Sequence, residues 1–257
     1  MELIDEIRED RKRLKGKSWK EKASHIFTYY KFPILAALVV VCIAVSLICS
    51  RIGSPETALS GILLNSYSYD SMLSATDPSS FSEEFLDELH LDRSHYTLSF
   101  RMNLTYSQSS DSVSSSYSDY QSLMTIVSYM AAEELDFITG DLGAMVGLAY
   151  QGYFADLSEV LTEEQYAVYA PCFLYIDLEV LEAINDQAAE SQESVPEIPD
   201  CRKPETMERP VPVLIDMSRS DTLQSVYCYS FDTIAFGMIA NAPHPDNTLK
   251  YIDYLMR

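Results

Sequence analysis

The feature that most constrains this chain is an uncharged apolar run of 18 residues, FPILAALVVVCIAVSLIC, between Phe32 and Cys49. As an α-helix, this run would extend about 27 Å, close to the thickness of the hydrocarbon core of a bilayer. Lys31 and Arg51 close its two ends, and a pair of tyrosines precedes it at the expected membrane interface. A buried core helix is usually shorter and apolar on one face only. The run therefore predicts a transmembrane helix over 32–50.

A cleaved signal peptide is the main alternative for this segment. The charged region of a signal peptide is normally short, whereas 31 residues precede the apolar run here. Val41 and Ile48 stand directly before Cys42 and Cys49, so neither cysteine follows the small residue typical of a lipoprotein cleavage site. We therefore expect a signal anchor that is retained in the lipid bilayer.

The distribution of cations predicts the orientation of this anchor. Nine Lys and Arg residues lie within residues 1–31, and only Arg51 lies close to the other end of the run. Cytoplasmic flanks of membrane helices are enriched in Lys and Arg. We expect a single-pass protein of the cell membrane with a cytoplasmic N-terminus and an extracellular C-terminal domain. The expected parts are a basic segment (1–31), the transmembrane helix (32–50), a linker (51–57) and an extracellular α/β domain (58–257).

The charge of the expected outer part limits its partners. The whole chain has a net charge of −21, and residues 50–257 hold nine Lys and Arg against thirty-three Asp and Glu. A protein that binds nucleic acid needs a basic face, so nucleic acid is excluded as an expected partner. The acidic surface would either attract cationic peptides or metal ions, or serve only to keep the domain soluble.

No motif for catalysis, metal binding or cofactor binding occurs in the sequence. The three cysteines beyond the apolar run, Cys172, Cys201 and Cys228, are odd in number and lack the C-x-x-C spacing. The four histidines form no H-x-x-x-H pattern, and no glycine-rich phosphate loop or G-x-S-x-G turn is present. We therefore expect no enzyme, no metal site and no cofactor.

Strand and helix signals alternate along the outer part. Residues 107–120 hold many serines and predict a flexible loop, and the acidic, proline-rich residues 190–210 predict another. The alternation predicts a layered α/β domain with a mostly parallel sheet. The expected strands are 58–65, 96–106, 135–139, 212–217 and 232–240. The expected helices begin near Ser80 or span 121–135, 142–151, 177–189 and 248–256, with a turn and short helix at 155–161 and another short helix capped by 218–221.

Two of these elements carry sharper expectations. The strand that contains Phe137 and Ile138 lacks polar alternation, so it should be central, with these two side chains buried on opposite faces. The helix at 121–135 spaces its apolar residues at i, i+3, i+4 and i+7, which predicts one inward face. That face comprises Leu123, Ile126, Val127 and Met130.

Two stretches of the sequence resemble the bacterial extracellular solute-binding proteins, the receptor subunits of ABC importers. Residues 134–161 (ELDFITGDLGAMVGLAYQGYFADLSEVL) resemble a strand and helix of that family, and residues 233–256 (TIAFGMIANAPHPDNTLKYIDYLM) resemble its last strand and helix. Residues 58–65 would then form its first strand. Only 49 residues lie between Leu161 and Val211, too few for the second lobe usual in the family. The resemblance implies a reduced, membrane-anchored relative with one lobe of a periplasmic-binding-protein-like fold.

The resemblance implies two functions of different classes. The first is a membrane-anchored protein that binds a small solute or helps an ABC permease. The second is a structural or assembly protein of the bacterial envelope that keeps the fold without binding solute, and its partner would be another envelope protein.

Ligands of open α/β sheets bind at the carboxyl ends of the strands. The residues expected at that edge are Asn65, Tyr67, Gly140, Asp141, Ser218 and Arg219. They are candidates for ligand binding, partly because free N–H groups at the helix start after Asp141 would suit an anion. The alternative is local, since Asp141 and the serines at 218 and 220 are also good helix N-caps.

Overall fold

A computed structural model describes residues 31–53, 55–68, 79–102, 104–106, 117–190, 196–229 and 233–257. The chain divides into two compact units, Met1–Ser54 and Pro55–Arg257, the second of which we call the C-terminal domain. The boundary falls inside the expected linker at 51–57.

The apolar run of the first unit lies in a single helix, α3 (Lys31–Gly53). Among its described side chains, large apolar ones are exposed between Phe32 (72%) and Val45 (52%), including Val40 (65%). Among the residues that the structure describes, no helix has the length and apolar character that crossing a membrane requires. The transmembrane helix over 32–50 therefore remains a prediction from the sequence.

The C-terminal domain is built on a sheet of six described strands in the order β3-β1-β4-β8-β6-β5. Strand β1 runs parallel to β3 and β4, whereas β8 is antiparallel to both β4 and β6, and β5 is antiparallel to β6. The strands are β1 (Glu56–Leu63), β3 (Tyr96–Arg101), β4 (Phe137–Asp141), β5 (Phe173–Asp177), β6 (Pro210–Asp216) and β8 (Ile234–Met238).

The α/β class is as expected, but the expectation of a mostly parallel sheet is wrong. Parallel neighbours need a crossover that returns the chain to the opposite end of the sheet. In the described residues between β6 and β8, the chain forms the short helix α11 (Asp221–Val226) and a three-residue strand, and β8 runs back antiparallel to β6. After β5, helix α10 (Leu178–Glu190) leads away and the chain returns to the same end, where Asp177 pairs with Pro210.

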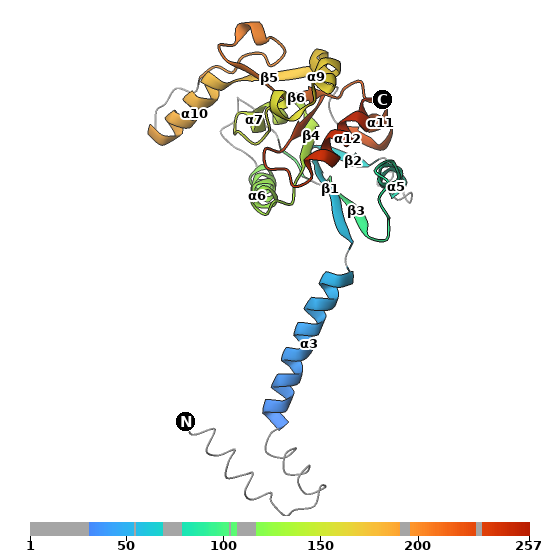
Figure 1. Ribbon diagram of the computed structural model, residues 1–257. Helices are drawn as coiled ribbons and strands as arrows, with labels where there is room; N and C mark the ends of the chain where they lie inside the picture. The colour runs from blue at the N-terminus through green and yellow to red at the C-terminus, as the bar shows by residue number, and fades with distance from the viewer. Residues whose placement is uncertain are drawn as a thin grey trace, which may run out of the picture. The chain divides into compact units, whose positions relative to one another are not determined.

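Helices cover both faces of this sheet (Figure 1). Helices α6 (Tyr117–Ala131) and α7 (Leu142–Ala149) pack on the face of Ile138. Helices α5 (Ser79–Glu88) and α12 (Pro245–Leu255) pack on the opposite face, with Phe137. Both side chains are 0% exposed, and β4 lies inside the sheet between β1 and β8. The prediction of a central strand with two buried faces is confirmed.

Aromatic rings fill the core on the Phe137 face. The Phe137 ring stacks on Phe236 with centroids 5.0 Å apart, and Tyr251 lies at the same centroid distance from Phe137. This packing needs a glycine on the neighbouring strand, because a Cβ on Gly61 would lie 2.1 Å from the Phe137 ring. The aromatic core thus explains why β1 carries a glycine at its centre.

Helix α6 differs from the expectation at two points. It begins at Tyr117, inside the loop expected over 107–120, whose residues 107–116 lie outside the described part. Val127, expected to face inward, is 36% exposed, whereas Asp119, Ser122 and Ile126 are buried. The buried stripe follows the spacing 119, 122 and 126, and Val127 lies about 100° around the helix from Ile126. Leu123 and Met130 are half-buried, as expected for the edges of that stripe.

The short helix expected within 155–161 is confirmed as the helical turn α8 (Leu157–Val160). Helix α9 (Glu163–Tyr169) and strand β5, which follow α8 in that order, have no counterpart in the expectation. A second, two-stranded antiparallel sheet joins β2 (Ser66–Ser68) to β7 (Tyr227–Tyr229).

Candidate functional site

Three chain segments with expected site residues meet at one edge of the main sheet. Strands β1, β4 and β6 run in the same direction, because β1 is parallel to β4 and both β4 and β6 are antiparallel to β8. Asn65, Asp141 and Ser218 follow or end these strands, so they share the carboxyl edge, as the sequence predicted. We call the segments 64–66, 140–142, 216–220 and 233–234 the carboxyl rim. The Leu64 N–H donates to the Thr139 carbonyl (2.7 Å) across this rim.

Asn65 ties three segments together at the carboxyl rim. Its Nδ2 donates to the Asp141 carboxylate and to the Tyr106 carbonyl (2.7 Å), and its Oδ1 accepts from the Tyr106 N–H (3.0 Å). Both amide hydrogens are therefore used within the chain. Asn65 also has a φ of 54°, a left-handed conformation that asparagine adopts more readily than most residues. The residue is held in this position by local geometry and by three bonds.

Asp141 caps helix α7, as the local alternative predicted. Its Oδ1 accepts from the Ala144 N–H (3.1 Å), and its other oxygen accepts from Asn65. The Leu142 N–H donates to the Thr233 carbonyl (3.2 Å). Two of the first three N–H groups of α7 are thus bound within the chain, which leaves little room for the anion site expected there.

Gly140 has a packing role in the structure. A Cβ at this position would lie 2.9 Å from the Leu64 Cβ, so the glycine permits the close approach of β4 to the end of β1. The lack of a side chain at Gly140 lets the two strands pack closely, and Gly140 is buried. Gly140 therefore contributes to the candidate site only by bringing Asn65 and Asp141 together.

Ser218 joins β6 to β8, and it is not the N-cap that the alternative expected. Its Oγ donates to Asp216 (2.5 Å) and accepts from the Ile234 N–H (3.1 Å). Burial raises the pKa of Asp216, but the bonds from Ser218 and the nearby Arg202 outweigh burial, and its pKa lies below the usual value. Of the two serines expected as N-caps, Ser220 has that role for α11, because its Oγ accepts from the Leu223 N–H (3.0 Å).

The two other candidates stand apart from this cluster. The backbone of Tyr67 pairs with Cys228 in the small sheet, and the Tyr67 side chain lies outside the described part. Arg219 is exposed, and within the described residues it forms no ion pair. Within the carboxyl rim, Asn65, Gly140 and Asp141 therefore lie together, whereas Ser218 binds Asp216 and Ile234 and Arg219 forms no described ion pair with the cluster.

The sequence analysis missed a buried carboxylate at the opposite end of β4. Asp136 is 0% exposed and accepts from the Ser60 N–H (2.7 Å) and the His244 N–H (2.7 Å). The His244 Nδ1 also lies 3.0 Å from Asp136 Oδ2. These contacts join β1, β4 and the start of α12, which makes Asp136 a structural tie. The sequence feature that could have indicated this role is the position of Asp136 directly before an apolar strand.

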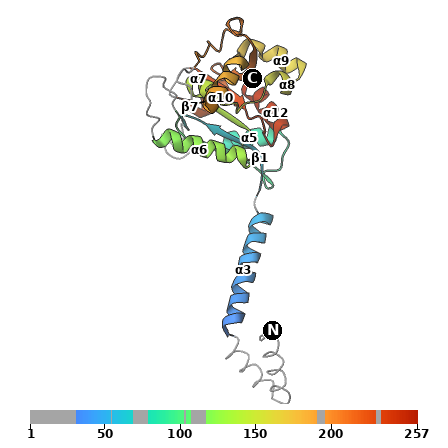
Figure 2. The ribbon, with the colours of Figure 1, turned by 90° about the vertical axis from the view of Figure 1, so that its left-hand side faces the viewer.

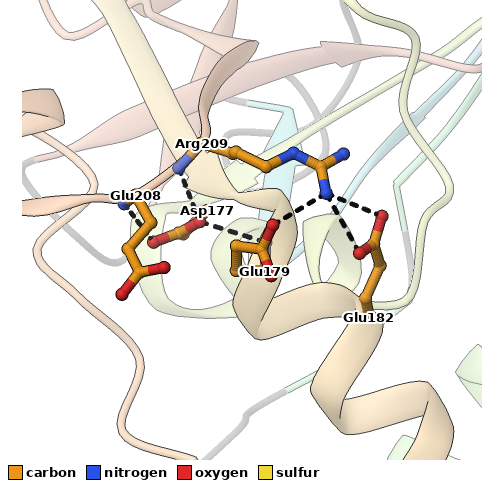
Figure 3. A network of polar contacts seen from close by, with 5 residues as sticks. All are labelled: Asp177, Glu179, Glu182, Glu208 and Arg209. Carbon is orange, nitrogen blue, oxygen red and sulfur yellow. Dashed lines mark hydrogen bonds and ion pairs between the residues drawn. The ribbon is translucent and has the colours of Figure 1, made fainter.

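A second carboxylate network lies where α10 begins (Figure 3). Asp177 accepts from the N–H groups of Glu208 (2.8 Å), Arg209 (3.1 Å) and Glu179 (3.1 Å). The Arg209 guanidinium pairs with Glu179 (2.9 Å) and Glu182 (3.0 Å). Burial raises the pKa of Asp177, but the three N–H groups and Arg209 outweigh burial and leave the pKa below its ordinary value. These acids are therefore compensated by partners within the chain.

Metal and thiol chemistry have little support in the described part of the chain. Within it, no group of three His, Cys, Asp or Glu residues could hold a metal ion. Among the cysteines whose side chains the structure describes, Cys42, Cys172 and Cys201 are free. Burial raises the pKa of the Cys201 thiol, with Arg202 opposing that rise, so this cysteine is a poor nucleophile.

Described residues of the C-terminal domain line at least two hollows. One of about 480 Å³ lies between residues 104–105 and the first half of α6. Tyr117, Tyr120 and Gln121 contribute to its uncharged lining. The other, of about 300 Å³, lies beside α10 and has an acidic lining that includes Asp177 and Glu179. The first hollow has the neutral, aromatic character of a site for a small uncharged molecule.

Comparison of the chain with protein-family models, curated proteins and solved structures finds no match. The resemblance to extracellular solute-binding proteins consequently remains a prediction that rests on residues 134–161 and 233–256.

Proposed function

We propose that this chain is a non-catalytic, membrane-anchored protein of the bacterial cell envelope whose C-terminal domain serves as an assembly module. The observation that carries the proposal is the state of the polar groups at the carboxyl rim. Asn65, Asp141 and Ser218 each bind other parts of the same chain. In a ligand-binding receptor, the same edge of the sheet would instead keep several convergent polar groups available for the ligand.

The membrane anchor is supported by the sequence and by the helix that contains the uncharged run. Nine cations precede this run, which favours a cytoplasmic location for residues 1–31. Helix α3 exposes large apolar side chains such as Phe32 (72%) and Val40 (65%). Exposed apolar surface of this kind is costly in water and is typical of contact with lipid or with another protein.

Capture of a small solute, with or without an ABC permease, is the second candidate function. It is favoured by the uncharged hollow of about 480 Å³ that Tyr117, Tyr120 and Gln121 help to line. Aromatic faces and amide groups would suit a neutral solute such as a sugar or a small peptide. The hollow would then replace the carboxyl rim as the binding site.

A thermal-shift experiment on the full chain in detergent separates the two functions. The probes are a panel of sugars, amino acids, short peptides and inorganic anions. A ligand present at 100 times its dissociation constant would stabilise the protein by about 2.7 kcal/mol, which raises the melting temperature by several degrees. We expect no such shift for any probe.

A saturable shift would overturn the assembly proposal, and two variants would then locate the site. Tyr120→Ala should abolish a shift that arises in the hollow beside α6. Asn65→Ala should abolish one that arises at the carboxyl rim. A shift that survives both substitutions would place the ligand at neither surface and would still contradict the proposal.

A further inference from the structure

Helix α6 exposes an uncharged face whose residues repeat with heptad spacing. Tyr117, Tyr120, Met124 and Val127 are 77%, 56%, 41% and 36% exposed, and Ala131 continues the same spacing. Intervals of three and four residues place side chains on one stripe of a helix, the arrangement by which two helices pack together. Figure 2 looks onto this side of the C-terminal domain and shows α6 along its length. We call these five residues the α6 face.

The α6 face carries no charge, and its only hydroxyls are the phenolic groups of Tyr117 and Tyr120. The only charged residue of the helix is Asp119, which is 7% exposed and lies on the buried side. The hydroxyls of Thr125 and Ser128, which border the face, donate to the carbonyls of Gln121 (2.8 Å) and Met124 (2.7 Å) in the preceding turn. Such bonds satisfy the hydroxyl within its own helix. The surface is therefore suited to apolar and aromatic contact.

We propose that the α6 face binds the α6 face of a second copy of this chain, as an antiparallel helix pair about a two-fold axis at Met124. The inference rests on the proposed assembly function and names its partner. A two-fold interface uses the same patch on both copies, so the patch must be complementary to itself. The α6 face meets this requirement through the order of its side chains along the helix.

Large side chains occupy the first half of the α6 face and small ones occupy the second half. In an antiparallel pair centred on Met124, the two methionines meet at the axis and Tyr117 lies opposite Ala131 of the other copy. Tyr120 packs beside Val127 of the other copy, within one residue's rise (about 1.5 Å) of the same level. Large residues thus meet smaller ones on either side of the Met124 pair, which is how interfaces fill space without voids. A parallel pair would instead place tyrosine against tyrosine at one end and leave the small residues facing one another at the other end.

The charge of the chain favours the same face. Residues 50–257 hold thirty-three acidic against nine basic side chains, so most surfaces of two copies repel each other. An approach through the uncharged α6 face avoids placing acidic groups directly opposite one another. Two copies of this chain therefore repel each other least when they meet through the α6 face.

The small area of the α6 face limits how strongly two copies can bind each other. Stable protein interfaces bury about 800 Å² on each partner, and one face of a 15-residue helix provides only part of that area. The pair should consequently be weak for chains that diffuse freely in three dimensions. Anchoring two copies in one membrane raises their effective concentration and favours pairing.

The test uses the full chain in lipid vesicles with a benzophenone photo-crosslinking side chain in place of Met124. Illumination should yield a product of twice the chain mass. Met124→Glu, tested with the benzophenone in place of Val127, should reduce this product by roughly tenfold or more, since like charges at an interface repel strongly. The matched control is Val168→Glu, because Val168 is an exposed apolar residue (67%) on α9, far along the chain from α6. This control should cross-link as wild type does.

A charge-swap mixture shows whether the partner is a second copy. Vesicles that contain both Met124→Glu and Met124→Lys chains should regain the cross-linked dimer that either variant alone loses. Failure of the mixture to recover, monomeric wild type at high membrane density, or equal loss in the Val168→Glu control would overturn the inference. Circular dichroism of each variant establishes that the fold is intact. The assembly function would survive this outcome. A saturable solute shift that Tyr120→Ala abolishes would remove both proposals, because Tyr120 belongs to the hollow and to the α6 face. A solute shift that Tyr120→Ala leaves unchanged would remove the assembly function without changing the cross-link.

Discussion

The buried carboxylate of Asp136 gives the sharpest test of how this domain is held together. In Asp136→Ala, the N–H groups of Ser60 and His244 lose acceptors that lie 2.7 Å away in the native protein. Each buried donor left without a partner costs about 1–3 kcal/mol, so the two together predict a loss of about 2–6 kcal/mol. That loss is a large fraction of the stability of an ordinary domain, about 5–15 kcal/mol.

Urea unfolding of the full chain in detergent measures this loss. Tyrosine fluorescence is the suitable probe, because the only tryptophan is Trp19, outside the C-terminal domain. Asp156→Ala is the matched control, since Asp156 only caps the short helix α8 through the Ser158 N–H (2.8 Å). The control should cost about 0.5–2 kcal/mol. If Asp136→Ala cost no more than Asp156→Ala, the assignment of Asp136 as the tie between β1, β4 and α12 would be refuted.

Four further outcomes are expected. Ile138→Ala should lower the free energy of unfolding by about 2–5 kcal/mol, and an unchanged urea midpoint would contradict its place in the core. Gly61→Ala should destabilise the domain by more than the usual ~1–3 kcal/mol of overpacking, because the added Cβ meets the Phe137 ring. A compensating Phe137→Leu substitution should recover part of this loss in the same assay. Protease added to intact protoplasts should remove the C-terminal domain and spare residues 1–31, and an untouched domain would reverse the proposed topology. Asp177→Asn should remove part of the acid sensitivity of the fold.

The sequence predicted the centre of the domain better than its edges. The apolar strand of Phe137 and Ile138 could be placed inside the sheet because burial on both faces removes the alternation of polar and apolar residues. The N-cap role of Asp141 was also predictable, since a cap depends only on its own helix. The cap is a local feature, and the central position of the strand requires only that helices cover both of its faces.

Strand direction and pairing partners depend on connections that a single sequence encodes weakly. The position of β8 between β4 and β6 follows from the short return through α11, which has no periodic signature of its own. The bond from Asn65 to Asp141 joins residues 76 positions apart, and the tie from His244 to Asp136 spans 108 positions. Val127 was assigned to the wrong face because its helix buries the polar residues Asp119 and Ser122 in place of apolar ones.

The acid response of Asp177 follows from its environment. Burial raises the pKa of Asp177. The N–H groups of Glu208, Arg209 and Glu179 and the charge of Arg209 lower it by more than burial raises it, so the folded pKa lies below the ordinary value of 3.8. A carboxyl with a depressed folded pKa stabilises the fold above its unfolded pKa and loses that contribution as the pH falls through the folded value. Wild type should therefore exceed Asp177→Asn in stability near neutral pH, and the difference should shrink as the pH falls below about 3.8. Urea midpoints measured across this range test the sign, and a difference that grew on acidification would show that the native site binds the protonated acid more strongly than the carboxylate.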